Sequence, residues 1–166
     1  MSRTAEPVAS ASLARVLADA ERRGLAIEPV HLPEGTRSAA EAARACGCAV
    51  DQIVKSIVFR VAGDDRHVLF LTAGGSRVDP ARAGRLVGAA LEKADAAGVR
   101  GATGFAIGGV SPLGHLNEIE TWFDPKILDH AVIWAAAGTP NHVFSVAPAA
   151  LVEALNPRIG AFTEEP

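Results

Sequence analysis

The segment formed by residues 104–115 constrains the fold most strongly, because no regular helix or strand is expected to run through it. It holds four glycines and one proline in twelve residues, and a β-like run follows it. Glycine permits positive φ angles and leaves backbone N–H groups unshielded, while proline stiffens the chain. The segment therefore predicts a loop whose N–H groups can face an anion or a developing oxyanion. The alternative is a plain connecting loop, in which the glycines only satisfy turn geometry.

The composition is typical of one globular domain. Of the 166 residues, 49% are hydrophobic and 21% are charged, which is enough for a core and argues against disorder. No run reaches the roughly 18 apolar residues of a membrane span. We expect residues 1–11 to form a flexible N-terminus, residues 12–157 a single domain and residues 158–166 a C-terminal tail.

The spacing of apolar residues predicts a mixed α+β fold. Helical periodicity, with capping residues and terminal glycines, indicates helices over 12–23, 39–46, 79–87, 95–100 and 148–155. Runs rich in β-branched residues indicate strands over 25–32, 53–62, 67–73, 91–94, 118–123, 130–136 and 142–146. The pair 53–62 and 67–73 flanks a turn and predicts a hairpin. Helices and strands alternate irregularly, so we expect a mixed sheet with helices packed around it.

Charge and cysteine content limit the partners. The net charge of −3 argues against a broad basic surface for nucleic acid, so we predict no DNA partner, although one end of a nucleotide chain can still be held locally. The two cysteines, Cys46 and Cys48, are too few for a disulfide framework, and the five histidines lie singly. We therefore expect no metal, no cofactor and a reducing, cytoplasmic setting.

Lys55 is the first candidate for a functional side chain. If residues 53–61 form a strand, Lys55 shares the apolar face of Ile57 and Phe59. A lysine there is rarely buried without a partner, and its cation can bind an anion. The alternative is a lysine at the start of the strand whose ammonium group extends to water. Periodicity alone does not decide between an anion-binding lysine and a lysine that extends to water.

Several further residues are weaker candidates. Thr72 and Gly74 end a strand where the backbone can approach a ligand closely. Ser111 is a poor nucleophile, because the segment lacks the final glycine of a G-x-S-x-G elbow and Pro112 removes an N–H group. His142 is a candidate base or orienting group, but a surface histidine is the simpler interpretation. Asp124, which precedes a proline, is most simply an Asx turn.

Taken together, these segments resemble the YbaK/prolyl-tRNA-synthetase-associated editing domain family. The resemblance rests on the order and spacing of five segments and covers roughly residues 12–156. The segments are 35–43, 53–59, 71–74, 103–115 and 134–141. In the segment 134–141 this chain has three alanines where some branches of the family carry a serine or an extra glycine.

The resemblance implies a largely antiparallel, partly barrel-like sheet flanked by helices. It implies a hydrolase that acts in trans on the ester of mischarged tRNA, such as tRNA(Pro) carrying alanine, cysteine or another small residue. The tRNA 2′-hydroxyl would help to activate water. The partners would be the aminoacylated acceptor end and, in addition, prolyl-tRNA synthetase. Lys55 would hold the terminal nucleotide.

Further site residues follow from the same resemblance. The loop residues Gly108, Gly109, Val110, Ser111 and Pro112 would position the ester through backbone groups. The substrate would also contact Thr36, Thr72, Gly74, Phe105, Gly138 and His142. Two alternatives remain open: a binding module for the tRNA end or a synthetase without catalytic activity, and an esterase that does not need tRNA.

Overall fold

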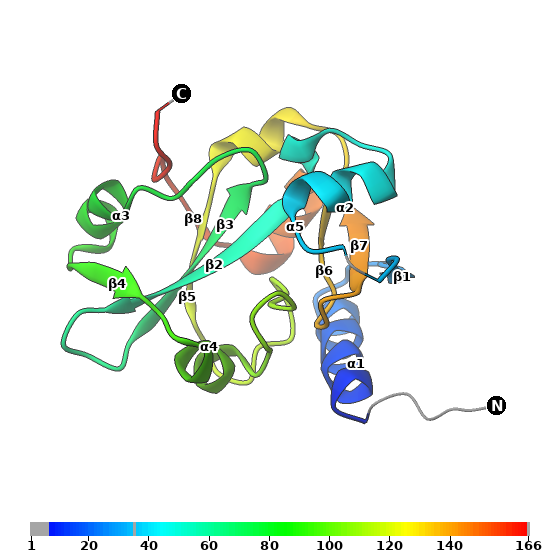
Figure 1. Cartoon of the computed structure of the whole chain (residues 1–166), viewed down its shortest axis with the longest axis horizontal. Helices are drawn as coiled ribbons and strands as arrows, with labels where there is room; N and C mark the ends of the chain where they lie inside the picture. The colour runs from blue at the N-terminus through cyan, green and yellow to red at the C-terminus, as the bar shows by residue number, and fades with distance from the viewer. Residues whose placement is uncertain (1–6, 35, 166) are drawn as a thin grey trace.

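The computed structural model describes residues 7–34 and 36–165. The larger sheet has the strand order β4-β2-β3-β5-β8 and the smaller sheet has the order β1-β7-β6. The strands are β1 (Val30–His31), β2 (Val54–Val61), β3 (His67–Ala73), β4 (Leu91–Lys93), β5 (Glu120–Phe123), β6 (Ile133–Ala136), β7 (His142–Val146) and β8 (Arg158–Ile159). The helices are α1 (Pro7–Arg22), α2 (Ala39–Cys46), α3 (Pro80–Val87), α4 (Ala96–Thr103) and α5 (Pro148–Leu155), with 3-10 turns η1 (Val50–Gln52) and η2 (Pro125–Asp129). Figure 1 shows the two sheets with the helices around them.

The sheets confirm the mixed, largely antiparallel architecture. β2 and β3 form the predicted hairpin, in which Lys55 lies opposite Thr72. The pairs β3–β5 and β5–β8 are parallel, and the other strand pairs are antiparallel. The sheets do not close into a barrel, because the bridge between them is a single parallel pair, Ile53 with Trp134. Closure would need continuous pairing around the circumference.

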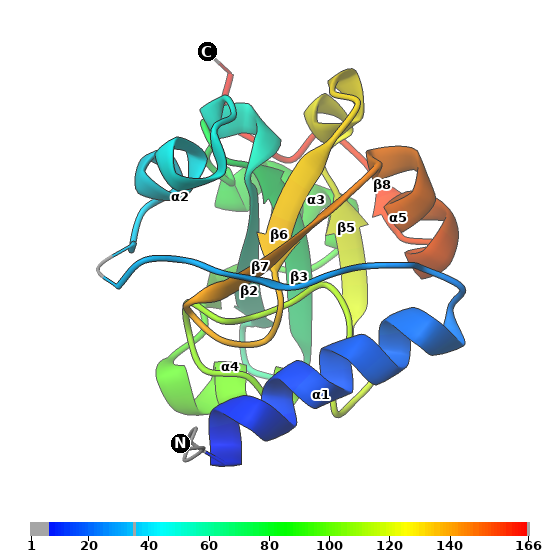
Figure 2. The same cartoon turned by 90° about the vertical axis from the view of Figure 1, so that its right-hand side faces the viewer.

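Residues on the two faces of the larger sheet belong to two apolar clusters. Val54 and Val58 of β2 belong to the larger cluster, which also receives side chains from α1, α4, α5 and the smaller sheet. Phe59 and Val61 point to the other face, where they belong to a second cluster with Phe162 and with Ala83 of α3. This alternation is the one predicted for the strand, because successive side chains leave a strand on opposite faces. Figure 2 shows α1 running across the lower end of the smaller sheet.

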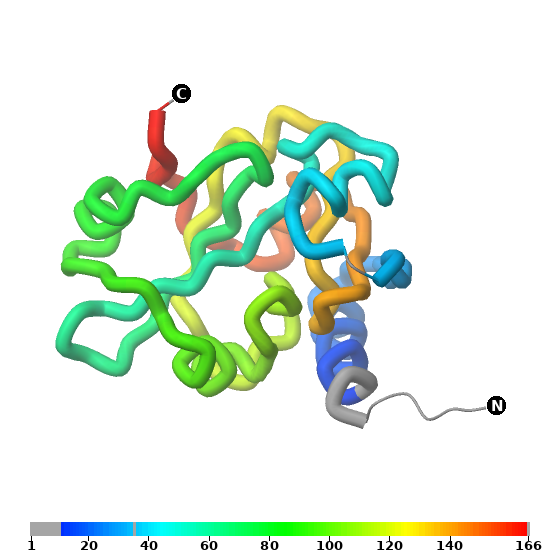
Figure 3. The backbone as a smooth tube through the Cα atoms, viewed as in Figure 1, coloured from blue at the N-terminus to red at the C-terminus, as the bar shows by residue number. Residues whose placement is uncertain are grey.

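Several boundaries differ from the sequence prediction. Helix α1 begins at Pro7 rather than at residue 12. The strand predicted over 25–32 is reduced to Val30–His31, because the pairing with β7 covers those two residues. Residues 158–166 were expected to be a tail, yet this segment contributes β8 and the fully buried Phe162. Thr163 pairs with Val78, so the C-terminal segment runs back beside the chain before α3 (Figure 3).

Helix α2 is defined at both ends by its sequence. The Ser38 side chain accepts a hydrogen bond from the Glu41 N–H, and the Glu41 carboxylate accepts one from Ser38, which is a complete capping box. At the other end Gly47 takes the left-handed conformation with φ of 71°. The caps fix where the helix starts, and therefore where the residues before it lie. No helix in the described part of the chain is long and apolar enough to span a membrane.

Candidate functional site

A cavity of about 320 Å³ lies where the two sheets diverge beside α2. The side chains of its walls are mostly small or apolar. They come from β2, β6, α2, the turn between β6 and β7, and the segment 104–115, called the glycine-rich loop below. The lining residues are Leu32, Thr36, Arg37, Ser38, Ala39, Ala42, Ile53, Val54, Lys55, Ser56, Ile57, Ile107, Gly108, Val110, Trp134, Ala135, Ala136, Thr139, Pro140, His142 and Val143. Five of the residues predicted from the sequence therefore meet here: Thr36, Lys55, Gly108, Val110 and His142.

Lys55 is half-buried at the wall of this cavity. Its ammonium Nζ donates a hydrogen bond to the Ser76 carbonyl at 2.5 Å. Burial lowers the pKa of Lys55, and the nearby Arg77 lowers it further, while Asp51 acts in the opposite direction. The side chain is thus held in place by one backbone acceptor, with donor capacity left over because an ammonium has three N–H groups. It can bind an anionic or oxygen-bearing group at the cavity.

The glycine-rich loop is held against the rest of the fold by α1. The Arg15 guanidinium donates to the carbonyls of Gly104 at 2.8 Å and Gly114 at 3.2 Å. The Asp19 carboxylate accepts from the Gly114 N–H at 2.8 Å. Arg15 also lies over the Phe105 ring, 4.8 Å from its centroid. Both ends of the loop are therefore fixed, which gives its middle a defined position at the cavity.

Within the loop, Ile107, Gly108 and Val110 line the cavity, whereas Gly109 does not. Gly109 is packed so tightly that a Cβ atom would lie 2.9 Å from the Cα of Thr139. Its N–H donates to the Ala106 carbonyl at 2.9 Å, within the loop itself. The Gly109 N–H is therefore already hydrogen-bonded in this structure, and the absence of a side chain at this position allows close packing against Thr139.

Three other predicted residues of this segment, Phe105, Ser111 and Pro112, are buried and do not line the cavity. Ser111 is fully buried and its hydroxyl accepts from the Leu113 N–H at 3.2 Å. Phe105 is fully buried in the main core. Pro112 lines a different hollow, between α1 and β5. The buried Ser111 hydroxyl does not line the cavity.

His142 lines the cavity from the first position of β7. Its Nδ1 lies 2.7 Å from the Thr139 hydroxyl. Across the β1–β7 pair its ring meets the ring of His31 edge to face, with centroids 4.9 Å apart. Burial lowers the pKa of His142 from its ordinary value of 6.5, and His31 lowers it further. The imidazole is therefore favoured in its neutral form.

Three other predicted residues, Thr72, Gly74 and Gly138, lie outside the cavity. The buried Thr72 hydroxyl donates to the Phe70 carbonyl at 3.1 Å. At Gly74 a Cβ atom would lie 2.1 Å from the Val50 carbonyl oxygen, and at Gly138 it would lie 2.8 Å from the Ser12 carbonyl oxygen. None of the three lines the cavity, whereas Thr36 does and donates to Pro33.

Asp124 is the Asx cap that the sequence predicts. Its carboxylate accepts from the Lys126 N–H at 3.0 Å, at the start of η2. The same carboxylate accepts from the Ala73 N–H at 3.1 Å, at the end of β3. Asp124 therefore joins η2 to the sheet.

Sequence reasoning missed several cavity residues, chiefly Ser56, Arg37, Trp134 and Thr139. Ser56 is notable because its buried hydroxyl has no hydrogen-bond partner in the described part of the chain. A serine in the middle of an apolar strand is the signal that could have singled it out. Thr139 gave no such signal, because its contact with His142 depends on the conformation of the turn between β6 and β7.

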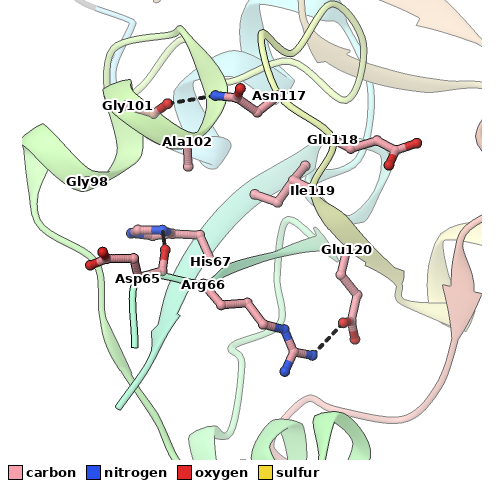
Figure 4. A pocket seen from close by; sticks show the side chains of 10 residues that line it. All are labelled: Asp65, Arg66, His67, Gly98, Gly101, Ala102, Asn117, Glu118, Ile119 and Glu120. Carbon is pink, nitrogen blue, oxygen red and sulfur yellow. Dashed lines mark hydrogen bonds and ion pairs between the residues drawn. The ribbon is translucent and has the colours of Figure 1, made fainter. Parts of the chain in front are cut away.

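A second hollow lies at the far end of the β2–β3 hairpin (Figure 4). It contains none of the predicted site residues. Arg66 pairs with Glu120 at 2.6 Å, and Asn117 donates to the Gly101 carbonyl at 3.1 Å. The lining carboxylates of Asp65, Glu118 and Glu120 outnumber its one arginine, so the hollow is unfavourable for an anionic ligand.

Cys46 and Cys48 are free thiols beside α2. Burial raises the pKa of both thiols, which leaves them protonated and weakly nucleophilic. Among residues 7–34 and 36–165, no group of three or more histidine, cysteine, aspartate or glutamate side chains is placed to hold a metal ion. The chemistry that the cavity itself offers is two cations, Lys55 and Arg37, a neutral imidazole, hydroxyl groups and apolar walls.

Comparison with known proteins identifies relatives of this architecture. The model of the aminoacyl-tRNA editing domain matches residues 33–154. A crystal structure described as a candidate trans-editing enzyme for prolyl tRNA synthetase is 39% identical, with a TM-score of 0.87; the match covers 98% of this chain and 100% of that one. A hypothetical protein of known structure is 25% identical with a TM-score of 0.83, over 90% and 99% of the two chains. The uncharacterized protein YwhH of Bacillus subtilis is 28% identical over 113 residues, which is 68% of this chain and 71% of YwhH.

Proposed function

Because this chain belongs to the aminoacyl-tRNA editing domain family, we propose that it hydrolyses the ester bond of mischarged tRNA. It would act in trans, with tRNA(Pro) carrying alanine, cysteine or another small residue as the substrate. The observation that carries the proposal is the half-buried Lys55 at the wall of a small, mostly apolar cavity. The cavity suits a small side chain, and the cation suits the phosphate or ribose of the terminal nucleotide.

The cavity walls support a small aminoacyl group. Ala135, Ala136 and Val110 offer methyl groups and no charge, so a bulky or ionic side chain gains little there. Ile107 is 59% exposed at the rim, which gives an apolar surface against which the terminal base can pack. A pocket of this kind separates near-isosteres by only about 1–3 kcal/mol, so discrimination between alanine, cysteine and serine would be graded.

The chemistry that we propose needs no covalent intermediate on the protein. Lys55 would fix the terminal nucleotide, the loop at Gly108 and Val110 would hold the ester, and the tRNA 2′-hydroxyl would help to activate water. An aminoacyl ester is already labile, so positioning and a few oriented donors supply the required lowering of the barrier. Prolyl-tRNA synthetase, which produces the mischarged species, is the partner we expect in addition to the tRNA.

The test is a deacylation panel with purified protein. Alanyl-, cysteinyl-, seryl-, threonyl- and prolyl-tRNA(Pro) are compared for the wild type, Lys55→Ala and the matched control Lys93→Ala, which changes an exposed lysine of β4. We expect turnover of a mischarged species with prolyl-tRNA(Pro) spared. Lys55→Ala should lower kcat/KM by about 10- to 100-fold, because one hydrogen bond to a charged group is lost.

The outcomes separate the proposal from its alternatives. Binding of tRNA without turnover of any species would favour a module that lacks catalytic activity. Turnover that is indifferent to the tRNA body and to removal of the 2′-hydroxyl would favour an esterase for small substrates. Full activity of a folded Lys55→Ala protein would remove the lysine from the mechanism.

A further inference from the structure

The turn between β6 and β7 places a buried hydroxyl against the one histidine that lines the cavity in the described part of the chain. Thr139 is 6% exposed. Its Oγ1 accepts a hydrogen bond from the Asn141 N–H at 3.2 Å and lies 2.7 Å from Nδ1 of His142. Both Thr139 and His142 line the cavity. The threonine hydroxyl is therefore engaged on two sides, by a fixed backbone donor and by the imidazole.

Counting protons assigns the tautomer of the imidazole. A hydroxyl has one hydrogen to donate, and in a neutral imidazole one nitrogen donates while the other accepts. If Nδ1 carried the proton, it and Asn141 would both donate to Oγ1, and the hydroxyl hydrogen would have no acceptor in a buried position. If Nδ1 is unprotonated, the Thr139 hydroxyl donates to it while accepting from Asn141, so the buried hydroxyl is satisfied on both sides. An unmet buried donor is costly, so the proton belongs on Nε2.

We propose that Thr139 is a positioning residue that holds His142 in the Nε2–H tautomer, and so presents an N–H donor to the cavity. The target of that donor would be an oxygen of the aminoacyl ester or of the terminal ribose. This inference rests on the proposed function for its substrate, but the tautomer itself does not. Nε2 forms no hydrogen bond with any other residue from 7–34 and 36–165, so it remains free for a ligand.

Two further contacts fix the imidazole and its support. The edge-to-face contact with His31 restrains the ring from the β1 side. On the other side, Gly109 lies against the main chain of Thr139, where a Cβ atom would be 2.9 Å from the Thr139 Cα. The turn is thus wedged between the smaller sheet and the glycine-rich loop. His142 and the loop at Gly108 consequently face the same cavity.

The test reads the tautomer directly. Long-range ¹H–¹⁵N correlation spectra of the ¹⁵N-labelled protein at pH 8 distinguish Nε2–H from Nδ1–H imidazoles, and His142 is assigned with His142→Gln. We expect a pure Nε2–H pattern in the wild type and in Thr139→Ser. Thr139→Val, which removes the hydroxyl at nearly constant volume, should show a mixture of the two tautomers. Thr121→Val, which removes a half-buried hydroxyl outside the cavity, is the matched control and should leave His142 unchanged.

Activity provides the second readout. On the mischarged tRNA that the wild type deacylates best, Thr139→Val should lower kcat by about 3- to 10-fold, as the loss of one oriented hydrogen bond predicts, and Thr139→Ser should restore it. An Nδ1–H pattern in the wild type, or an unchanged tautomer in Thr139→Val, would overturn the inference. A shifted tautomer with full activity would also overturn the positioning role. If no aminoacyl-tRNA is deacylated, the proposed function fails, while the spectra still decide the tautomer.

Discussion

Replacement of Asp19 by asparagine tests how α1 holds the glycine-rich loop. The Asp19 carboxylate accepts from the Gly114 N–H at 2.8 Å and pairs with Arg23 at 3.0 Å and with Arg22. Burial alone would raise the pKa of Asp19, but the hydrogen bond from Gly114 and the charges of Arg23 and Arg22 outweigh it. The pKa is therefore held below its ordinary value of 3.8. Asparagine keeps the shape of the side chain and removes its charge.

The contacts set the size of the effect. The Arg22 side chain is 71% exposed, so its ion pair contributes little in water. The buried bond from Gly114 to a charged acceptor contributes more, about 1.5–3 kcal/mol. We expect Asp19→Asn to lose about 2 kcal/mol of stability at pH 7. For a chain of this length that corresponds to a decrease in Tm of about 4–8 °C.

The pH dependence of the stability loss distinguishes a lost charge from a packing defect, because the effect of a packing defect would not follow the titration of a carboxyl group. A carboxyl group with a depressed pKa in the folded state stabilises the protein above its unfolded pKa, and this contribution is lost as the pH falls through the folded value. The difference in Tm between the wild type and Asp19→Asn should therefore be full at pH 7 and shrink below about pH 4. Thermal unfolding followed by circular dichroism measures it, with the exposed Glu21→Gln as control. Equal Tm values at pH 7, or a difference unchanged at pH 3, would refute the reasoning.

Three further predictions concern the cavity. Gly109→Ala should destabilise the fold by about 1–3 kcal/mol in chemical denaturation, because its methyl group would overlap the backbone of Thr139; unchanged stability would contradict the packing. Ser56→Ala should leave Tm unchanged or raise it, since the buried hydroxyl has no hydrogen-bond partner in the described structure, and a clear decrease would reveal a missing partner. The acid limb of the pH–rate profile should lie below 6.5, because burial and His31 both lower the pKa of His142. Replacement of His31 by asparagine should move that limb upward, and a limb that stays in place would exclude the coupling.

Local chemistry allowed much of the fold to be predicted from the sequence. The alternation in 53–61 defined which face of β2 carries Phe59, and the hairpin with 67–73 followed from the turn between them. The parallel pairing of β3 with β5 and the return of the C-terminal segment could not be predicted in this way. Such pairings join residues about 50 or more positions apart, and their partners are chosen by the packing of the whole core rather than by local pattern.

The candidate site shows the same division. Lys55 could be predicted because a lysine on the apolar face of a strand is rarely buried without a partner. Gly108 could be predicted because it lies in a loop with four glycines in twelve residues. Thr72 and Gly74 were weaker candidates from the sequence, and the structure places the Thr72 hydroxyl within the sheet and Gly74 against η1. A glycine that admits a ligand and a glycine that admits another backbone look the same in a sequence. The difference depends on which segment the fold brings to that side.

The role of Gly109 follows from that distinction. Glycine in the loop was expected to free N–H groups for an oxyanion, but the Gly109 N–H is bonded to Ala106 within the loop. What the missing side chain permits is the approach of Thr139, whose hydroxyl contacts His142. The loop would thus contribute to catalysis partly through a neighbour, by supporting the turn that orients an imidazole. If so, Gly109→Ala should disturb the tautomer of His142 as well as stability, which the same spectra would detect. A destabilised Gly109→Ala protein with an undisturbed Nε2–H pattern would show that the loop and the histidine act separately.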